Sequence, residues 1–349
     1  MKLLRILFFP FSLLYGVVMA LRNILFAWGV LRSESFDVPL ISIGNITVGG
    51  TGKTPHTEYL INLLKGHSKL AVLSRGYGRH TKGFREVTER STPELCGDEP
   101  CQMKRKFPEQ LVLVDENRRE GIHQILNMAR PHVVLLDDAY QHRWVKPGLS
   151  ILLVDYSRPI FIDFMMPTGH LREFPVGSRR ADVIIVSKCP ADISEQKKAY
   201  FTDQLRIGKH QKIYFSTYVY DELKMVFPNI PMRDFDCNHS EILLLTGIAN
   251  PQPLEDYLRQ LGANVSAVRF SDHYQFTNKD IERLEQQFEA LKSSNCRIIT
   301  TEKDAIRLRS GLAIPTVIKE NLLYLPIVVS VLDKKEELHQ IIENYVAKN

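Results

Sequence analysis

Residues 38–55 read VPLISIGNITVGGTGKTP, a β-branched apolar run that passes directly into a glycine-rich turn. A continuously apolar run of this length is typical of a strand buried on both faces, and residues 54–65 read as a helix. The turn follows the phosphate-loop pattern G-x-x-x-x-G-K-[ST], except that Thr47 replaces the first glycine. The stretch therefore predicts a strand, a nucleotide-binding loop and a helix, and the loop comprises Thr47, Val48, Gly49, Gly50, Thr51, Gly52, Lys53 and Thr54.

Each residue type in this loop has a use in binding a nucleotide. Glycines let backbone N–H groups turn toward phosphate oxygens, and the N-terminal end of the following helix attracts the same negative charge. Lys53 can reach the β- and γ-phosphates, and Thr54 can offer its hydroxyl to Mg²⁺. The alternative is a glycine-rich turn in which the Lys-Thr pair occurs by chance.

Further apolar runs, alternating with helical patterns, follow this unit. Because they lack a polar–apolar alternation, they favour parallel strands buried between helices, at residues 70–76, 111–115, 132–138, 150–155, 182–188, 241–251, 265–270 and 296–304. The fold class is therefore α/β with two lobes, the first a P-loop NTPase-type parallel sheet. We expect a helical segment over 1–35, a P-loop domain over 36–215, a linker over 216–240 and a smaller α/β lobe over 241–349. Residues 156–181 show no strong periodicity and predict a long functional loop.

The composition excludes several classes of protein. The chain has 349 residues, of which 44% are hydrophobic and 24% charged, so it is neither disordered, collagenous nor a coiled coil. A net charge of +5 is too small to favour wrapping nucleic acid, so we expect no nucleic-acid partner. Five cysteines without a C-x-x-C spacing argue against a disulfide scaffold and a structural zinc ribbon.

The N-terminus is unusually apolar, since residues 6–21 carry no charge between Arg5 and Arg22. A helix of this length, about 24 Å, is short for a bilayer core of about 30 Å. Three interpretations are open: a cleaved signal peptide, a buried core helix, or a segment seated in a membrane as one tilted span or as interfacial helices. The last is favoured, because no small-x-small cleavage site follows Leu21 and Trp28 suits the headgroup level.

A pair of acids ends the apolar run VVLLDD at 133–138. A carboxylate at a strand tip beside a phosphate loop suits Mg²⁺, and the alternative is two solvated acids. Guanine-specific proteins carry N-K-x-D at a strand end, whereas the best candidate here is Ser187-Lys188-Cys189-Pro190. The residues thus predict a nucleoside triphosphate with Mg²⁺ and give guanine no support, which favours ATP.

Other polar clusters also lie at expected strand ends, and each could instead have a purely structural or solvent-exposed role. Asp98 in GDEP is a candidate carboxylate base or part of an acidic turn, and His273 after residues 265–270 is a candidate site residue or a structural histidine. SRGYGR at 74–79 offers the guanidiniums of Arg75 and Arg79 or is a plain glycine turn. GHLRE at 169–173 belongs to a site or is merely solvated.

Together these motifs resemble the tetraacyldisaccharide 4′-kinase family, the lipid A 4′-kinases of Gram-negative bacteria. The resemblance rests, in chain order, on GNITVGGTGKTP (44–55), LSRGYGR (73–79), GDEP (97–100), LLDDAYQHR (135–143), PTGHLRE (167–173), LTGIANP (245–251), FSDHYQFT (270–277) and TTEKDAIRL (300–308). It implies transfer of the ATP γ-phosphate to the 4′-hydroxyl of a tetraacylated glucosamine disaccharide 1-phosphate, giving lipid IVA. It also implies contact with inner-membrane lipid at the cytoplasmic face, as a peripheral or singly anchored protein.

The resemblance also assigns roles to residues. It implies that Asp98 is the base, that His273 is its partner from the other lobe and that Lys53 is catalytic. Metal ligands would be Thr54, Asp138 and Glu173, although the sequence does not decide whether Asp137 or Asp138 touches the metal. The substrate or phosphate site would comprise Asn45, Arg75, Tyr77, Arg79, Asp137, Gln141, His142 and Arg172.

Two other functions would share the phosphate loop. A membrane-associated nucleotide switch or targeting NTPase that acts on a protein would hydrolyse ATP without lipid and would not need Asp98 paired with His273. A soluble metabolite kinase would keep its solution activity after deletion of residues 1–35.

Overall fold

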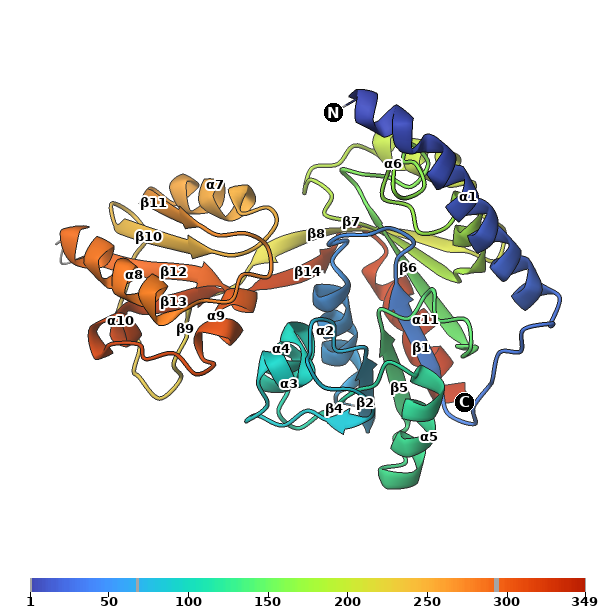
Figure 1. Cartoon of the computed structure of the whole chain (residues 1–349), viewed down its shortest axis with the longest axis horizontal. Coiled ribbons are helices and arrows are strands. Elements are labelled where there is room, and N and C mark those ends of the chain that lie inside the picture. Colours follow the sequence, from blue (N-terminus) through green and yellow to red (C-terminus); the bar gives the residue numbers. More distant parts are fainter. Residues whose placement is uncertain (1, 67–68, 292–294, 349) are drawn as a thin grey trace.

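Two α/β lobes lie side by side in the computed structural model, which describes residues 2–66, 69–291 and 295–348 (Figure 1). The predicted fold class is confirmed. The larger lobe contains a sheet whose strands, within the described residues, run in the order β14-β8-β7-β6-β1-β5-β2-β4-β3. Their bounds are β1 Leu40–Gly44, β2 Leu70–Ser74, β3 Arg85–Glu86, β4 Leu111–Val114, β5 Val133–Asp137, β6 Leu149–Asp155, β7 Val183–Ser187, β8 Lys212–Tyr220 and β14 Ile327–Val331.

Strand β1 lies at the centre of this sheet, paired in parallel with β5 and β6. Its residues are all buried because helices cover both faces of the sheet. One face packs against α2 (Lys53–Leu64), α4 (Asp98–Lys106) and α11 (Lys335–Lys348), and the other against α5 (Arg118–Met128) and α6 (Glu195–Gln204). The parallel strands therefore direct their carboxyl ends, where ligands bind in such folds, to a single edge.

The smaller lobe repeats this plan. Its sheet has the order β11-β10-β12-β13-β9, with only β9 antiparallel among the described strands. These strands are β9 Lys224–Met225, β10 Glu241–Thr246, β11 Asn264–Arg269, β12 Cys296–Thr301 and β13 Leu322–Leu325. Helices α8 (Asn278–Leu291), α9 (Glu302–Leu308) and α10 (Thr316–Asn321) cover one face, and α7 (Gln252–Gln260) covers the other.

The expected division of the chain between the lobes is wrong in two places. Residues 212–220, which overlap the expected linker, form β8 of the larger sheet, and β14 pairs with it in antiparallel register. The C-terminal helix α11 then packs into the core of the larger lobe through Leu338 and Ile342. The second lobe therefore does not extend to residue 349, and the chain crosses between the lobes twice, along β8 and β14 (Figure 1).

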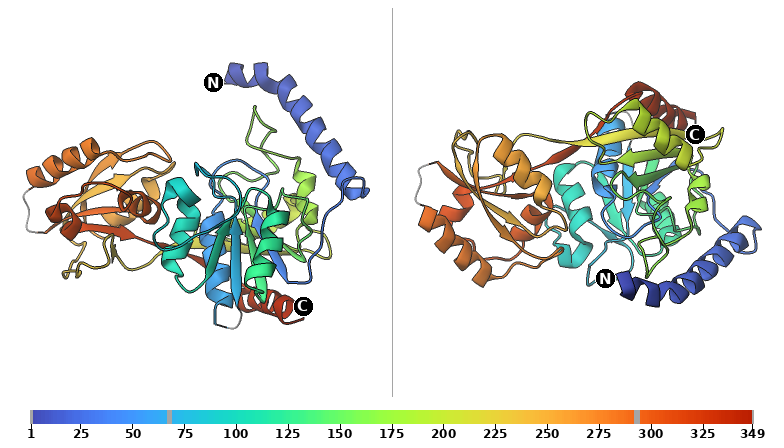
Figure 2. Two further views of the ribbon diagram at one scale, coloured as in Figure 1. Left: turned by 60° about the horizontal axis from the view of Figure 1, so that its bottom comes forward. Right: turned by 90° about the horizontal axis from the view of Figure 1, so that it is seen from above.

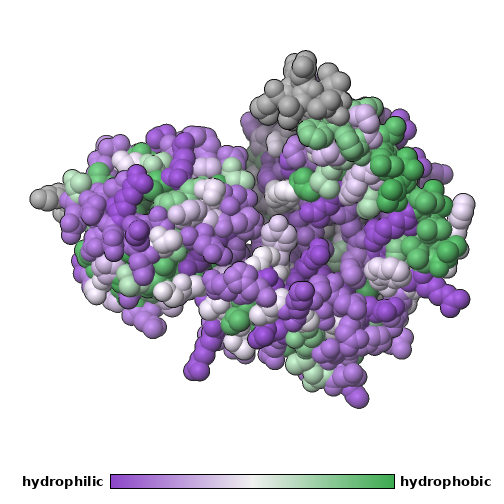
Figure 3. Space-filling model, in the orientation of Figure 1, coloured by the Kyte–Doolittle hydropathy of each residue, from purple (hydrophilic) through white to green (hydrophobic). Residues whose placement is uncertain are grey.

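The apolar N-terminus forms one continuous helix, α1 (Lys2–Ala27), which lies along the outside of the larger lobe (Figures 1 and 2). The distribution of its apolar side chains is the reverse of that in a helix on the surface of a soluble protein. A narrow stripe that includes Ser12, Gly16 and Phe26 is buried against the lobe, whereas large apolar side chains remain exposed over much of its length, including Phe9, Phe11, Leu13, Leu14, Val17, Val18 and Leu21. Figure 3 shows this face as a hydrophobic strip on the larger lobe.

Polar contacts fix α1 to the lobe at several points. The hydroxyl of Ser12 hydrogen-bonds Thr168 at 2.6 Å, and the amide of Asn23 donates to Glu173 at 2.7 Å. A Cβ at Gly16 would meet the ring of Phe174 at 2.7 Å, so glycine permits the close approach. The helix therefore packs as part of the folded lobe, which differs from both a free span and a pair of interfacial helices.

Candidate active site

The predicted phosphate loop connects the end of β1 to the start of α2. Gly49 and Gly52 have φ values of 96° and 91°, a left-handed region that favours glycine. A Cβ at Gly49 would meet the guanidinium of Arg158 at 2.9 Å, and a Cβ at Gly52 would clash with the hydroxyl of Tyr218. The loop thus has the glycines that its backbone needs, although Thr47 departs from the usual pattern.

Neighbouring strand ends hold the loop in place. The Asn45 amide donates to the Thr51 hydroxyl at 2.7 Å, so Asn45 supports the loop from inside. Lys188, with a φ of 60°, donates to the Gly50 carbonyl and forms an ion pair with Asp155 at 2.7 Å. The backbone N–H of Val48 donates to the His170 carbonyl at 2.8 Å, which brings the PTGHLRE segment beside the loop. Sequence reasoning gave Arg158, Lys188 and Tyr218 no role, because only the folded sheet brings them to the loop.

The paired acids at the end of β5 have different surroundings. Asp137 is buried and accepts hydrogen bonds from Ser74 at 2.9 Å and Thr57 at 3.0 Å. Burial and the neighbouring Asp138 charge raise the pKa of Asp137 to about 6. Asp138 has a φ of 49° and lies 3.5 Å from the ammonium group of Lys53. Asp138 is therefore the acid that faces the phosphate-binding lysine, while Asp137 is enclosed by hydroxyl groups.

Glu173 lies in a different cluster. Both of its carboxylate oxygens accept from Arg180 at 2.9 Å, and Asn23 of α1 and Gln141 also donate to it. An acid so fully paired lacks the free oxygens that a metal ligand needs, so its expected metal role is not supported. The described residues contain no group of three or more His, Cys, Asp or Glu side chains arranged to hold a metal ion.

Three further predicted site residues lie near Glu173 and the end of β1: Gln141, His142 and Arg172. The N–H of Arg172 donates to the Ile46 carbonyl at 2.8 Å, which ties this segment to the end of β1. The Gln141 carbonyl accepts from Arg22 of α1 at 3.1 Å. Burial, together with the positive charges of Arg118, Arg22 and Arg75, lowers the pKa of His142 to about 4, so its ring is neutral at pH 7. This cluster links the apolar helix to the phosphate-binding edge of the sheet.

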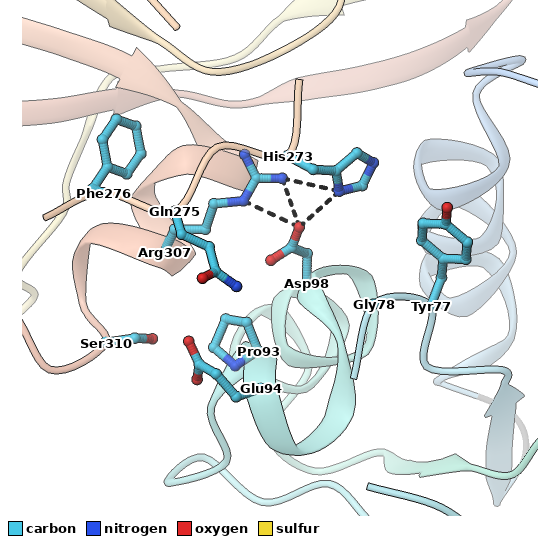
Figure 4. A pocket seen from close by; sticks show the side chains of 10 residues that line it. All are labelled: Tyr77, Gly78, Pro93, Glu94, Asp98, His273, Gln275, Phe276, Arg307 and Ser310. Atoms are coloured by element: carbon cyan, nitrogen blue, oxygen red, sulfur yellow. Dashed lines mark hydrogen bonds and ion pairs between the residues drawn. The ribbon is translucent and has the colours of Figure 1, made fainter. Parts of the chain in front are cut away.

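Asp98 and His273, from different lobes, meet in a third cluster (Figure 4). Asp98 is the first residue of α4, and Gly97 before it has a φ of 93°. His273, whose φ is 59°, places its Nδ1 3.3 Å from Oδ2 of Asp98. A non-glycine residue in this conformation is uncommon and often occurs at functional sites. The expectation that these two residues face each other across the lobes agrees with this geometry.

Arg307, on α9 of the smaller lobe, is the main residue that sequence reasoning missed. Its Nη2 lies 2.6 Å from Oδ2 of Asp98 and 3.4 Å from Nδ1 of His273. Lys303, one helical turn earlier, pairs with Glu99 at 3.1 Å. Both residues lie in the motif TTEKDAIRL at 300–308, so the signal was present, but nothing in the spacing showed which acid they would meet.

Asp98 is charged in this environment. Burial alone would raise its pKa, but the hydrogen bonds from His273 and Arg307 outweigh burial and lower the pKa to about 2. The contacts of His273 and Arg307 fall on Oδ2, and Oδ1 takes part in none of them. Beside the carboxylate is a cavity of about 180 Å³, lined by Tyr77, Gly78, Pro93, Glu94, Asp98, His273, Gln275, Phe276, Arg307 and Ser310.

The SRGYGR motif is divided between two places. Tyr77 is exposed, and its ring lies 5.8 Å from that of His273, at the interlobe cavity. The guanidinium of Arg79 is bound to Glu116 and donates to the Gly83 carbonyl at 2.9 Å, so it supports its own loop. Arg75 is exposed just beyond the end of β2. Tyr77 and Arg75 therefore remain available to a ligand, whereas Arg79 is engaged within the loop.

The chemistry of this arrangement is that of a phosphoryl transferase. One edge of the larger sheet offers a lysine, a glycine-rich anion-binding loop and an acid beside the lysine. The interlobe cavity offers an ionised carboxylate whose Oδ1 takes part in none of the described contacts with His273 and Arg307. Such a pair of sites can bind a nucleotide on one side and a hydroxyl acceptor on the other.

Comparison with known proteins identifies relatives along the whole chain. Residues 4–347 match the family model described as tetraacyldisaccharide-1-P 4′-kinase. The chain is 45% identical over 353 residues to a tetraacyldisaccharide 4′-kinase of Bacteroides thetaiotaomicron, covering 98% of this chain and 93% of that protein. A protein of the same name from Flavobacterium johnsoniae is 42% identical, covering 100% and 99% of the two chains.

A solved structure is also similar. It is a crystal structure of LpxK from Aquifex aeolicus in complex with ATP, with a TM-score of 0.77 and 29% sequence identity. The match covers 98% of this chain and 99% of that one, so both lobes and the N-terminal region are included.

Proposed function

The chain belongs to the tetraacyldisaccharide 4′-kinase family, and on that premise we propose how its residues divide the work of the reaction. It is an ATP-dependent kinase of lipid A biosynthesis that phosphorylates the 4′-hydroxyl of a tetraacylated glucosamine disaccharide 1-phosphate. A family match over nearly the whole chain leaves no support for a nucleotide switch that acts on a protein, or for a soluble metabolite kinase.

Asp98 is the base that takes the proton of the acceptor hydroxyl. The observation that carries this assignment is the placement of Oδ1, which points away from the contacts of His273 and Arg307 with Oδ2. A sugar hydroxyl is a poor nucleophile, and a carboxylate within hydrogen-bond reach assists it as the new bond forms. His273 and Asp98 come from different lobes, so their contact depends on how the lobes approach each other.

The phosphate loop holds the nucleotide, with Lys53 on the transferring phosphoryl group. Mg²⁺ fits this site because Asp138 is partly exposed beside Lys53 and Thr54 lies in the first turn of α2, and Mg²⁺ usually needs only one or two carboxylates besides phosphates and water. When bound, Mg²⁺ neutralises the charge that develops on the phosphate oxygens. Asp137 orients its neighbour through its hydrogen bonds with Ser74 and Thr57, while Arg172 and Arg75 serve the phosphate or substrate site.

The decisive experiment is an acceptor-dependence assay. Purified full-length protein is incubated with radiolabelled ATP and Mg²⁺, with or without the lipid disaccharide 1-phosphate, and the lipid is separated by thin-layer chromatography. We expect label on the lipid and little ATP consumption without it. Equal ATP hydrolysis in both reactions would contradict the kinase assignment of the interlobe site.

The larger lobe rests on the cytoplasmic face of the inner membrane, with α1 in the lipid interface. Three observations support this seating: the exposed face of α1 is almost wholly apolar, its polar stripe is turned toward protein, and it is long and apolar enough to span but is docked along the lobe. Ile162, Phe164 and Val176 are also exposed, on the segment whose Thr168 and Phe174 contact α1, and extend the apolar surface.

Full-length protein should therefore sediment with vesicles that contain anionic phospholipid. The variant Phe11→Ser/Leu14→Ser alters two side chains that are 61% and 64% exposed, so it should weaken sedimentation severalfold without unfolding the lobe. Val317→Ser, which changes an exposed apolar residue on the smaller lobe, is the matched control and should sediment like the wild type. Unchanged sedimentation of the double variant would contradict the seating of α1.

A further inference from the structure

Arg307 makes the shortest described contact with the carboxylate that we assign as the base, although it lies in the other lobe (Figure 4). Its guanidinium is only 6% exposed, whereas the His273 side chain is 41% exposed. Both Nε, at 3.1 Å, and Nη2, at 2.6 Å, approach the same oxygen, Oδ2. The carboxylate is therefore fixed mainly by the arginine, and the histidine is the more exposed and more distant partner at its edge.

The arginine is itself anchored to the smaller lobe. Its Nη1 donates to the Gly247 carbonyl at 3.0 Å and to Asp304 at 2.9 Å. Asp304 in turn accepts from the Gly247 N–H at 2.9 Å and from the Thr301 hydroxyl at 2.7 Å. The ends of β10 and β12 thus orient Asp304, which orients Arg307, through contacts that are charge-assisted at Asp304 and mostly buried.

We infer that Arg307 is a positioning residue of the kinase reaction, which clamps Oδ2 of Asp98 so that Oδ1 is presented to the acceptor hydroxyl and which ties the orientation of the base to the smaller lobe. This inference rests on the proposed role of Asp98 as the base. The described side-chain contacts of Arg307 are with Asp98, His273, Asp304 and Gly247 and not with the phosphate loop, and the inference adds a second function for the smaller lobe besides supplying His273.

A clamp of this kind has a consequence for the pH dependence of the reaction. The charged groups that face Asp98 are Arg307, His273 and Lys303 from the smaller lobe, with Glu99 beside it on α4 paired to Lys303. With Arg307 in place, the pKa of Asp98 is about 2, so its protonation lies below the range in which the enzyme works. Without the guanidinium, burial would dominate and the pKa of Asp98 would rise.

The test compares the pH profile of kcat/KM in the wild type, Arg307→Gln and Arg307→Lys. We expect the wild-type profile to stay flat on its acidic side, apart from steps caused by other groups. Arg307→Gln should lower kcat about tenfold to a hundredfold and add an acidic limb. Arg307→Lys keeps the positive charge, so it should recover much of the lost kcat and much of the flat acidic side of the profile. A limb that is absent from Arg307→Gln, or equally present in Arg307→Lys, would overturn the inference.

Arg309→Gln is the matched control, because it removes a half-buried guanidinium from the same end of α9. The Arg309 side chain donates to the carbonyls of Val226 and Met225 and does not contact Asp98. Arg309→Gln should therefore leave the pH profile of kcat/KM unchanged, whether or not it lowers the thermal stability. An ATP-dependent rise in melting temperature checks that each variant is folded with a working nucleotide site.

The controls distinguish failure of the proposed kinase function from failure of the role assigned to Arg307. Absence of acceptor-dependent turnover in the wild type would remove the proposed function, and with it the premise for Arg307. Normal wild-type turnover with a wild-type profile in Arg307→Gln would overturn only the role of Arg307. A folded, ATP-binding Arg307→Gln variant with low kcat and an unchanged pH profile would likewise reduce Arg307 to interlobe packing.

Discussion

The two lobes are built on the same plan, yet their charged residues serve in different ways. In the larger lobe, Lys53 at the start of α2 and Asp138 at the end of β5 face each other 3.5 Å apart, on the same edge of one sheet. In the smaller lobe, the charges at the corresponding edge reach outward, and Arg307, His273 and Lys303 all contact acids of the larger lobe.

The two parts of the site are therefore assembled differently. The larger sheet can assemble a phosphate-binding site alone, because parallel strands deliver their carboxyl ends to one edge. The base and its partners exist as a unit only while the lobes are in contact. Variants of the interlobe group should therefore act together, and variants of the phosphate loop should act independently of the smaller lobe.

The largest effect is expected from Asp98→Ala, which removes the base from the interlobe group. It should lower kcat by about 10²–10⁴-fold and change ATP binding little, because it acts on the acceptor hydroxyl. His273→Ala should lower kcat less, since the ring is more exposed and Arg307 still holds the carboxylate. Steady-state kinetics with the lipid acceptor and a separate ATP-binding measurement check both.

The double variant Asp98→Ala/His273→Ala sharpens this prediction. If the two residues act as one unit, it should be little worse than Asp98→Ala alone. Fully multiplicative effects, with a loss of thermal stability in His273→Ala, would instead mean that His273 only packs the smaller lobe.

The next effect concerns the larger lobe alone. Lys53→Ala removes the positive charge from the phosphate loop and should lower kcat/KM by about 10²–10³-fold, on the scale of one preorganised electrostatic donor. Combined with His273→Ala, its effect should multiply, because the two residues lie in separate parts of the site. Lys65→Ala, an exposed lysine at the other end of α2, is the control. Near-normal turnover of Lys53→Ala would show that this loop does not bind the transferred phosphate.

The smallest effect is expected on the pH dependence of stability, through an ion-pair cluster at the contact between the lobes. Glu58 of α2 is buried and Glu302 of α9 is partly buried, and the two share Lys106, at 2.6 Å and 3.2 Å respectively. Burial and the charge of Glu302 outweigh Lys106 and raise the pKa of Glu58 from its ordinary 4.5 to about 7. Between these values the folded state binds more protons than the unfolded state, so the free energy of unfolding falls as pH rises.

Glu58→Gln removes this titration and should flatten the decline of stability with pH by about 1–3 kcal/mol between pH 5 and pH 8. Lys106 keeps Glu302 as its partner in this variant. Chemical denaturation across that range is the measurement, with exposed Glu89→Gln as the control. A pH dependence identical to that of the wild type would contradict the interpretation of this shared contact.

Much of the larger sheet was accessible from the sequence, because strands buried on both faces leave a continuous apolar signature. The runs around β1, β2, β4, β5, β6 and β7 were identified within a few residues of their bounds. The phosphate loop could also be predicted from the sequence, since its glycines and Lys-Thr pair are adjacent in the chain. The pairing of Asp98 with His273 came from a family resemblance and not from spacing.

Other features could not be derived in this way. Strand β14 follows β13 of the smaller lobe after a single residue, Pro326, yet it pairs in the larger sheet, and nothing local marks which sheet it joins. Glu173 carries the signature of a functional acid, but the structure pairs it with Arg180 of its own segment, and its contact with Asn23 arises only when α1 packs against the lobe. Arg79 was likewise expected at the substrate and instead meets Glu116, which follows the neighbouring strand β4.

By itself, the sequence determined the local units of this protein: the strand, glycine-rich turn and helix that bind phosphate, and an N-terminal helix too apolar for an ordinary surface. These follow from neighbouring residues, because backbone freedom and hydrophobic patterning act over a few positions. Only the tertiary structure decided that Arg307 meets Asp98, that Lys106 is shared by two acids and that α1 turns its polar stripe inward. Those contacts join residues as much as 209 positions apart, and an ion pair takes its partner from whichever charge the packing of two lobes brings within reach.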